Sequence, residues 1–307
     1  MSVPRDLDVR ALGRRISTWG RFGQDDVRGS LNFVTPDAIC RAARLVKRGA
    51  VFSLALPLSA DGPQVGKVGR NNPVHLMSVI GDQLPGGFTA ADDWIFMPLQ
   101  CGTQWDCFAH GSYDDTLYNG VPASTVTARG SSVIGIERWK HDVIGRGVLL
   151  DVARLRGVPR MQIGEAISPE ELDRACAAQG VAVEPGDIVL VRTGWITMFT
   201  RDGDKVNLWE GEPGLSIACA DWLTSRRVAA VACDNFAVEV YPSETDTMIP
   251  LHMVLLRDAG IVLGELFDLE ELAEDCARDK VYEFLLVAPV LPVVGAVGTP
   301  INPLAIK

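Results

Sequence analysis

Four polar side chains share one parity in the stretch Gln100-Cys101-Gly102-Thr103-Gln104-Trp105-Asp106-Cys107-Phe108-Ala109-His110. They are Gln100, Gln104, Asp106 and His110, and in an extended chain even positions face the same side. A straight strand would separate the first from the last by about 33 Å, so the chain must bend for them to meet. Gly102 tolerates unusual backbone angles and is the expected bend, with a second bend or a helix start after Asp106. The stretch predicts a polar cluster on a bent strand.

These four side chains form a suitable ligand set for a divalent cation. A carboxylate, an imidazole and two amide carbonyls favour Mn²⁺ or a similar hard ion, although zinc also accepts aspartate and histidine. An ordinary turn with a satisfied polar cluster would use the same residue types. On this stretch alone both interpretations stand.

A second polar pair, His252 and Glu265, lies far along the chain. His252 begins a predicted helix that ends before Gly260, and its eight residues rise roughly 12 Å. The strand that follows, from Ile261 to Glu265, covers about 13 Å. If this strand runs back along the helix, Glu265 returns to the level of His252. A carboxylate inside a short apolar strand must be paired, protonated, bound to a metal or on a solvated face.

Composition and charge narrow the classes of function. The chain has 307 residues, 47% of them hydrophobic, and no linker divides it, so we expect one domain with a substantial core. The net charge of −10 disfavours nucleic acid and anionic membranes as partners. The start has no apolar segment typical of a secretory signal, and the seven cysteines contain no CxxC pair. These features predict a cytoplasmic protein with free thiols.

The rest of the chain predicts short strands alternating with helices. Helices are expected at 35–48, 168–180, 215–224, 252–259 and 269–272. Strands are expected at 51–56, 132–137, 147–150, 187–192, 228–232 and 261–267. The stretch 59–85, rich in Gly, Pro, Asn and Asp, predicts a long loop that covers a binding site. The pattern indicates an α/β fold with a mixed sheet and flanking helices.

The two polar segments resemble those of the cyclase-like metal-dependent hydrolases, which include bacterial kynurenine formamidases, isatin hydrolases and trans-dienelactone hydrolase. The family signature His-x-Gly-Thr-His-x-Asp-x-x-x-His and its later His and Glu are matched at Gly102, Thr103, Asp106, His110, His252 and Glu265. The resemblance covers nearly the whole chain. It implies a swivelling β/β/α-type single domain over 1–307, with 1–34 as an N-terminal extension packed on it. It also implies a homodimer or a homotetramer.

Two departures from the signature concern the metal. The family usually has histidines where this chain has Gln100 and Gln104, and glutamine at the first position resembles the dienelactone hydrolase branch. The loss of two imidazoles weakens a zinc site. The chain would then hold a Mn²⁺-type ion, no metal, or a metal on the four remaining residues Asp106, His110, His252 and Glu265.

The resemblance implies hydrolysis of a lactone, or of a cyclic or aryl amide, by a metal-activated water. The residues expected to take part are the metal ligands Gln100, Gln104 and Asp106, the catalytic groups His110, His252 and Glu265, and the substrate contacts Trp105 and His75. Core packing is the alternative for Trp105. Two other functions remain open. One is a metal-independent acid–base cyclase or lyase on the same scaffold, and the other is a non-catalytic protein that binds a small molecule.

Overall fold

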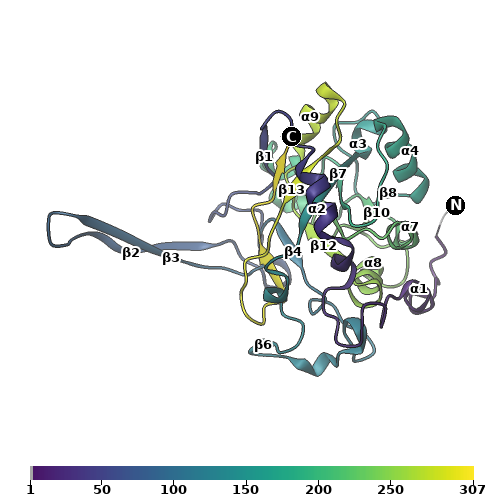
Figure 1. Cartoon of the computed structure of the whole chain (residues 1–307), viewed down its shortest axis with the longest axis horizontal. Helices are drawn as coiled ribbons and strands as arrows, with labels where there is room; N and C mark the ends of the chain where they lie inside the picture. The colour runs from purple at the N-terminus through teal and green to yellow at the C-terminus, as the bar shows by residue number, and fades with distance from the viewer. Residues whose placement is uncertain (1–2) are drawn as a thin grey trace.

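A nine-stranded mixed sheet lies at the centre of the structure, a computed structural model that describes residues 3–307 (Figure 1). In order across the sheet its strands are β1 (Val51–Ser53), β15 (Leu304–Ile306), β13 (Glu283–Val287), β7 (Ile144–Asp151), β9 (Ile188–Arg192), β11 (Ala230–Cys233), β12 (Val262–Glu265), β4 (Gln104–Asp106) and β14 (Gly298–Pro300). The strands from β7 to β12 pair in parallel, and those outside them pair antiparallel. The mixed sheet and its flanking helices confirm the predicted α/β class.

Helices cover the sheet and the ends of its strands. Their bounds are α1 (Val9–Ile16), α2 (Pro36–Ala43), α3 (Val152–Leu155), α4 (Pro169–Gln179), α5 (Thr197–Thr200), α6 (Lys205–Leu208), α7 (Cys219–Ser225), α8 (Pro250–His252) and α9 (Glu270–Asp279). The single-turn and irregular helices are η1 (Gly29–Phe33), η2 (Lys67–Gly69), η3 (Tyr118–Gly120), η4 (Ala123–Thr125), η5 (Ile136–Trp139) and η6 (Met253–Ala259). Helix α1 packs against η6, which is wound as a π-helix.

The central strands follow from their residues. All the residues of β9 and β11 are buried, so their continuous apolar runs are those of strands covered on both faces. The helix predicted at 168–180 is α4, which begins with a capping box at Ser168 and ends at Gly180 in a left-handed conformation. Thr35 caps α2, which stops at Ala43, earlier than expected.

The strand predicted at 132–137 is wrong. Ile134 and Ile136 are both buried, which produces the strand-like alternation. However, Ile136 instead begins η5, and its backbone N–H donates to the carbonyl oxygen of Ala296 at 2.8 Å. The burial reflects packing under a loop, which the alternation of residue types does not distinguish from sheet pairing.

The long loop predicted at 59–85 is wrong for its second half. Strands β2 (Val74–Gln83) and β3 (Thr89–Phe96) pair antiparallel into a hairpin that projects from the body as a long arm (Figure 1). Two bulges interrupt its register, between Met77 and Val79 and between Ile80 and Asp82. The alternation of apolar and polar residues that indicates a strand is interrupted here by further polar residues and by Gly81, so the sequence did not predict β2. A short hairpin forms from β5 (Val126–Thr127) and β6 (Gly130–Ser131). A two-stranded parallel sheet forms from β8 (Ala166–Ile167) and β10 (Gly214–Leu215).

The apolar stretch at 284–297 forms β13 and the loop that follows it. Over residues 3–307, none of the helices has the length and apolar character that a membrane crossing requires.

Ion pairs tie down the C-terminus around Asp275. Lys307 Nζ lies 3.0 Å from Asp275 Oδ2 and 2.8 Å from Asp279 Oδ1, and both Arg48 and Arg278 also pair with Asp275. Burial raises the pKa of Asp275, but hydrogen bonds from Arg278, Arg48 and Lys307 outweigh this and hold the pKa at about 2. The ionised carboxylate therefore stabilises the fold.

Acid should remove this contribution. Because the pKa in the folded state lies below that in the unfolded state, the stabilisation is present above pH ~4 and is lost as the pH falls to about 2. Both arginine partners are exposed, so we expect Asp275→Asn to lower the free energy of unfolding at pH 7 by only about 1–2 kcal/mol. Urea unfolding of this variant and of Asp202→Asn, an exposed control, measures the effect. Equal stability of the two variants would contradict the prediction.

Candidate active site

Strand β4 places two predicted site residues on one face of the sheet. Gln104 and Asp106 are fully buried, and Glu265 of β12 lies directly across from Gln104. The amide Nε2 of Gln104 donates to Glu265 Oε2 at 2.8 Å and lies 3.3 and 3.4 Å from the two carboxylate oxygens of Asp106. One amide therefore bridges two buried carboxylates.

His252 completes the cluster from the distant segment. Its Nε2 lies 3.1 Å from Glu265 Oε1, so the strand does return to the level of His252. One ligand atom from each of Asp106, His252 and Glu265 lies within 4.8 Å of the others, and all three residues are buried. The structure thus brings together the two segments on which the sequence prediction depends.

Glu239 holds His252 in place, and the sequence analysis missed it. Its Oε1 accepts a hydrogen bond from the backbone N–H of His252 and lies 2.8 Å from the ring Nδ1. Its Oε2 accepts from the backbone N–H of Leu251, also at 2.8 Å. A carboxylate in the apolar run Ala237-Val238-Glu239-Val240 was the available signal, of the same kind that identified Glu265.

Burial and repulsion set the charge states of the cluster. Burial raises the pKa of Glu265, and repulsion from Asp106 raises it further. Burial lowers the pKa of His252, but hydrogen bonds to Glu239 and Glu265 outweigh this effect and raise the pKa to about 10. Burial also raises the pKa of Glu212 well above its ordinary value. The cluster concentrates acidic groups away from water, and a proton or a cation must balance their charge.

The donor set of the cluster fits a divalent cation. Among the side chains of residues 3–307, the buried polar atoms without a hydrogen-bond partner are Gln104 Oε1 and Glu212 Oε1. The Gln104 amide nitrogen faces the two carboxylates, so the amide would have to turn over for its unpartnered carbonyl oxygen to serve as a further oxygen ligand. Asp106, His252, Glu265 and the carbonyl of Gln104 are therefore the residues that would hold an ion.

Gln100 and His110 lie at the margin of the cluster. A Cβ on Gly298 would stand 2.5 Å from Gln100 Nε2 and 3.0 Å from Asp106 Oδ1, so the glycine leaves room for both side chains. His110 Nε2 lies 4.0 Å from Asp106 Oδ2, and the His110 side chain is 24% exposed. His110 therefore stands between the buried carboxylate and the cavity that leads to it.

A cavity of about 380 Å³ opens onto His252, Glu265 and His110. The rings of Trp209 and Phe236 stack along it with their centroids 4.7 Å apart. Its other lining residues are Lys67, Val68, Arg70, Glu210, Ala237, Tyr241, Met248 and Ile249. The cavity combines an aromatic wall with a polar end.

The cavity residues include several that the sequence analysis did not single out. Arg70 Nη1 lies 3.8 Å from Glu265 Oε2, in the first half of the stretch expected to cover a binding site. Trp209 and Phe236 belong to segments that carry no recognisable motif. Their part in the site follows only from how the loops pack.

Trp105 and His75, the expected substrate contacts, lie elsewhere. Trp105 alternates with Gln104 and Asp106 along β4, so it points into the core, where its indole N–H donates to the carbonyl oxygen of Ala288 at 2.9 Å. His75 lies on β2 in the projecting arm, where its Nε2 is 2.6 Å from Asp93 Oδ2. Neither residue lines the cavity beside the cluster.

A residue next to each of Glu239 and Glu265 has a left-handed backbone conformation. Val238, before Glu239, has φ +63°, and Leu266, after Glu265, has φ +56°. Left-handed conformations are costly for such residues and persist only where surrounding contacts enforce them. Thr103 is one such contact, because its hydroxyl donates to the carbonyl oxygen of Leu266 at 2.6 Å. Thr103 of the central stretch thus helps to position Glu265.

Known proteins share this sequence pattern and this fold. The family described as putative cyclase matches residues 52–240. A crystal structure of a novel cyclase superposes with a TM-score of 0.88 at 39% identity, over 95% of this chain and 99% of the other. Isatin hydrolase A from Ralstonia solanacearum gives a TM-score of 0.61 at 19% identity, over 89% and 98% of the two chains. A predicted metal-dependent hydrolase from Bacillus stearothermophilus gives 0.52 at 14% identity, over 83% and 97%. A search of curated proteins found no significant match.

Proposed function

Because the chain belongs to the putative cyclase family, we propose that it is a metal-dependent hydrolase that opens a lactone, or a cyclic or aryl amide. The convergence of Asp106, His252 and Glu265 at the end of an aromatic cavity carries the proposal. The hydrolases that share the fold support it. The alternatives named from the sequence serve as outcomes of the tests below.

Asp106, His252, Glu265 and the Gln104 carbonyl would hold a divalent ion, Mn²⁺ or Zn²⁺. When bound, such an ion supplies Lewis acidity that polarises a carbonyl and activates water as a nucleophile. The protein's part is to keep these ligands dry and ordered. Glu239 does this for His252 by accepting hydrogen bonds from its backbone and lying against its ring.

Residues that line the cavity next to the cluster would transfer the protons of the reaction. The attacking water gives up a proton when it adds to the carbonyl, and the leaving oxygen or nitrogen takes up a proton when the C–O or C–N bond breaks. Glu265 faces the cavity, and the oxygen of its carboxylate that does not hold the ion would act as the base. His110, partly exposed beside Asp106, would protonate the leaving group.

The cavity favours a small ring as the substrate. Stacked Trp209 and Phe236 present an apolar wall to a flat ring, and the volume of about 380 Å³ suits a molecule of one or two rings. Arg70, near Glu265, offers a positive charge where the substrate carbonyl must approach.

Metal removal tests the proposal directly. We expect protein purified without chelator to contain about one divalent ion per chain. Chelation should lower turnover of a responsive lactone or N-acyl aniline by at least about 100-fold, because Lewis acidity contributes several kcal/mol to such reactions. Adding back Mn²⁺ or Zn²⁺ should restore turnover. Absence of any ion, together with undiminished turnover after chelation, would contradict it.

One observation favours a metal-independent acid–base cyclase or lyase as the second candidate. The Gln104 amide N–H donates to both Asp106 and Glu265. It therefore already reduces the repulsion between the two carboxylates that a bound cation would otherwise offset. His252 would then carry the proton between Glu239 and Glu265. Turnover that persists without metal identifies this version. Tight binding of lactones or N-acyl anilines without turnover of any of them, with or without added Mn²⁺ and Zn²⁺, identifies a binding protein.

A further inference from the structure

The cavity that reaches His252 and Glu265 carries exposed apolar side chains from two separate loops. Val68 of η2 is 79% exposed, and Met248, on the loop before α8, is 69% exposed. Ile249 follows Met248 and is 39% exposed. A single exposed apolar side chain is ordinary, but three that line one cavity form a patch, which we call the apolar rim.

Val68 has a backbone conformation that valine rarely adopts. Its φ of +49° and ψ of +27° are left-handed, and such a conformation persists in a β-branched residue only where surrounding contacts enforce it. Lys67 supplies such contacts, because its Nζ donates to the carbonyl oxygen of Trp209 at 3.0 Å and lies 2.8 Å from Glu210 Oε1. Asparagine would adopt this backbone more easily. The backbone therefore does not account for a valine here, and the exposed isopropyl group is the feature to explain.

The loop that carries Val68 is also attached to the aromatic wall of the cavity. The indole N–H of Trp209 donates to the carbonyl oxygen of Pro63 at 2.8 Å, so Trp209 and this loop hold each other at two points. Phe236 stacks on Trp209. The aromatic wall and the apolar rim thus belong to one cavity, with the wall next to the loop that forms part of the rim.

We propose that the substrate carries an apolar substituent, an alkyl chain or a further ring, which extends past the aromatic wall and packs against the apolar rim. The inference rests on the proposed function for the reactive ring, and it narrows the substrate class to rings that bear such a substituent. A cavity of about 380 Å³ accommodates one or two rings, so a longer substituent must leave through the opening. There the rim side chains and the substituent remove each other's apolar surface from water.

The charges that line the same cavity favour an apolar substituent over an ionic one. Lys67 and Glu210 are both about half exposed, and their side chains pair with each other at 2.8 Å. Each charge therefore compensates the other. Arg70 instead lies close to Glu265, at the end of the cavity where the carbonyl reacts.

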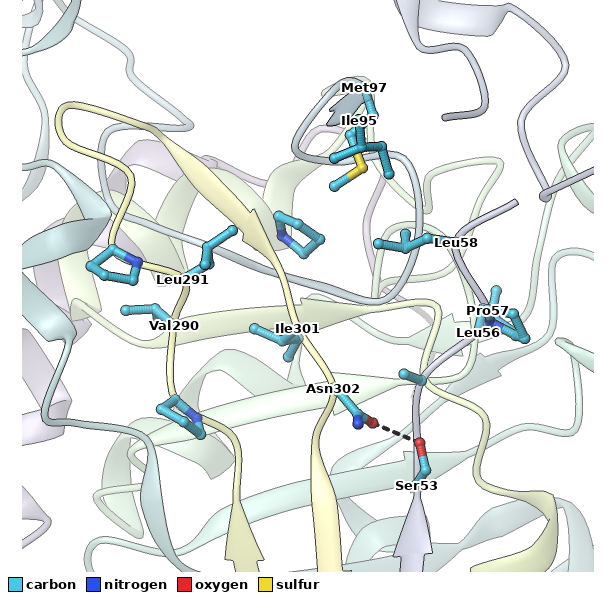
Figure 2. Close-up of a pocket in the computed structure, with 14 residues that line it drawn as sticks. Ser53, Leu56, Pro57, Leu58, Ile95, Met97, Val290, Leu291, Ile301 and Asn302 are labelled. Atoms are coloured by element: carbon cyan, nitrogen blue, oxygen red, sulfur yellow. Dashed lines mark hydrogen bonds between the residues drawn. The ribbon is translucent and has the colours of Figure 1, made fainter. Parts of the chain in front are cut away.

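A larger apolar groove of about 770 Å³ offers the substituent no path. Figure 2 shows Val290, Leu291 and Ile301 along it, with Ile95 and Met97 at one end. The groove shares none of its lining residues with the cavity, and no charged side chain lines it. A substituent attached to a ring beside His252 therefore meets the apolar rim and not this groove.

A homologous series of substrates tests the proposal. The series comprises γ-lactones whose alkyl side chain grows from one to about seven carbons, and acetanilides with 4-alkyl groups of the same lengths. A methylene that is fully removed from water contributes about fourfold to binding, and the rim covers only part of the chain. We therefore expect kcat/KM to rise about twofold for each added methylene until the chain passes the rim.

Rim variants show whether these side chains produce the rise. In Val68→Asn combined with Met248→Ser, kcat/KM should become nearly independent of chain length. Asparagine accepts the left-handed backbone, so urea unfolding should show that Val68→Asn alone is at least as stable as the wild type. Val294→Asn is the matched control, because Val294 is an 81% exposed loop valine that does not line the cavity, and it should keep the wild-type dependence. No dependence in the wild type, or equal dependence in the rim variant, would overturn the proposal.

Binding measurements separate this inference from the proposed function. Calorimetry of the 4-alkylacetanilides with chelator-treated protein gives a dissociation constant for each chain length without any turnover. Affinity that rises with length and depends on the rim supports the substituent site even if no member is hydrolysed. Turnover of the short members without any length dependence retains the hydrolase and rejects the substituent site. A flat series, together with a rim variant that changes the sedimentation coefficient, would assign the rim to a contact between chains and also reject it.

Discussion

Asp106→Asn is expected to lose the bound ion and to lower kcat/KM by at least about 1,000-fold, the largest effect in the molecule. Asp106 is fully buried, and the Gln104 amide lies between it and Glu265, the other carboxylate of the cluster. The substitution preserves volume but removes the charge that balances a cation. Ion content by elemental analysis and steady-state kinetics on the responsive substrate measure the two losses.

A measurement of the stability of the Asp106→Asn variant distinguishes loss of the ion from unfolding of the protein. Because Asp106 and Glu265 repel each other, the ion-free Asp106→Asn protein should be at least as stable as the ion-free wild type. The added ion should raise the melting temperature of the wild type only. Asp202→Asn, an exposed substitution of the same kind, should retain ion and activity. A variant that still binds one ion per chain with wild-type affinity would contradict the assignment of Asp106.

Glu239→Ala is expected to lower the free energy of unfolding by about 3 kcal/mol. The substitution leaves two backbone N–H groups at Leu251 and His252 without their buried acceptor and frees the His252 ring. Glu239→Gln keeps a carbonyl acceptor, so its loss of stability should be smaller. Urea unfolding of both variants measures the difference.

The Glu239→Gln variant also tests whether this residue positions His252 for function. We expect ion affinity to fall about 10–100-fold, because partners that orient a ligating histidine commonly have effects of this size. Glu244→Gln is the matched control, since Glu244 accepts a backbone N–H from Ile217 but does not touch a histidine. Unchanged ion affinity in Glu239→Gln, with stability lowered, would reduce Glu239 to a structural role.

Local patterns in the sequence predicted much of the site. Alternation put Gln104 and Asp106 on one face, and the helix and strand lengths returned Glu265 to His252. The same alternation turned Trp105 to the opposite face, although proximity to Asp106 had suggested a substrate contact. Such patterns extend over a few residues, so they indicate which face of a strand a side chain lies on and how far along a helix or strand it stands.

The sequence by itself therefore identified Asp106, His252 and Glu265 of the cluster, the family and the α/β class. Only the tertiary structure decided that β4 lies between β12 and β14, that Glu239 reaches His252, and that the aromatic wall and Arg70 line one cavity. It also turned part of an expected loop into an exposed arm. The physical reason is that strand pairing and loop packing depend on contacts between distant segments. These contacts are stabilised when two distant segments bury apolar surface against each other, and the sequence of either segment alone does not specify its partner.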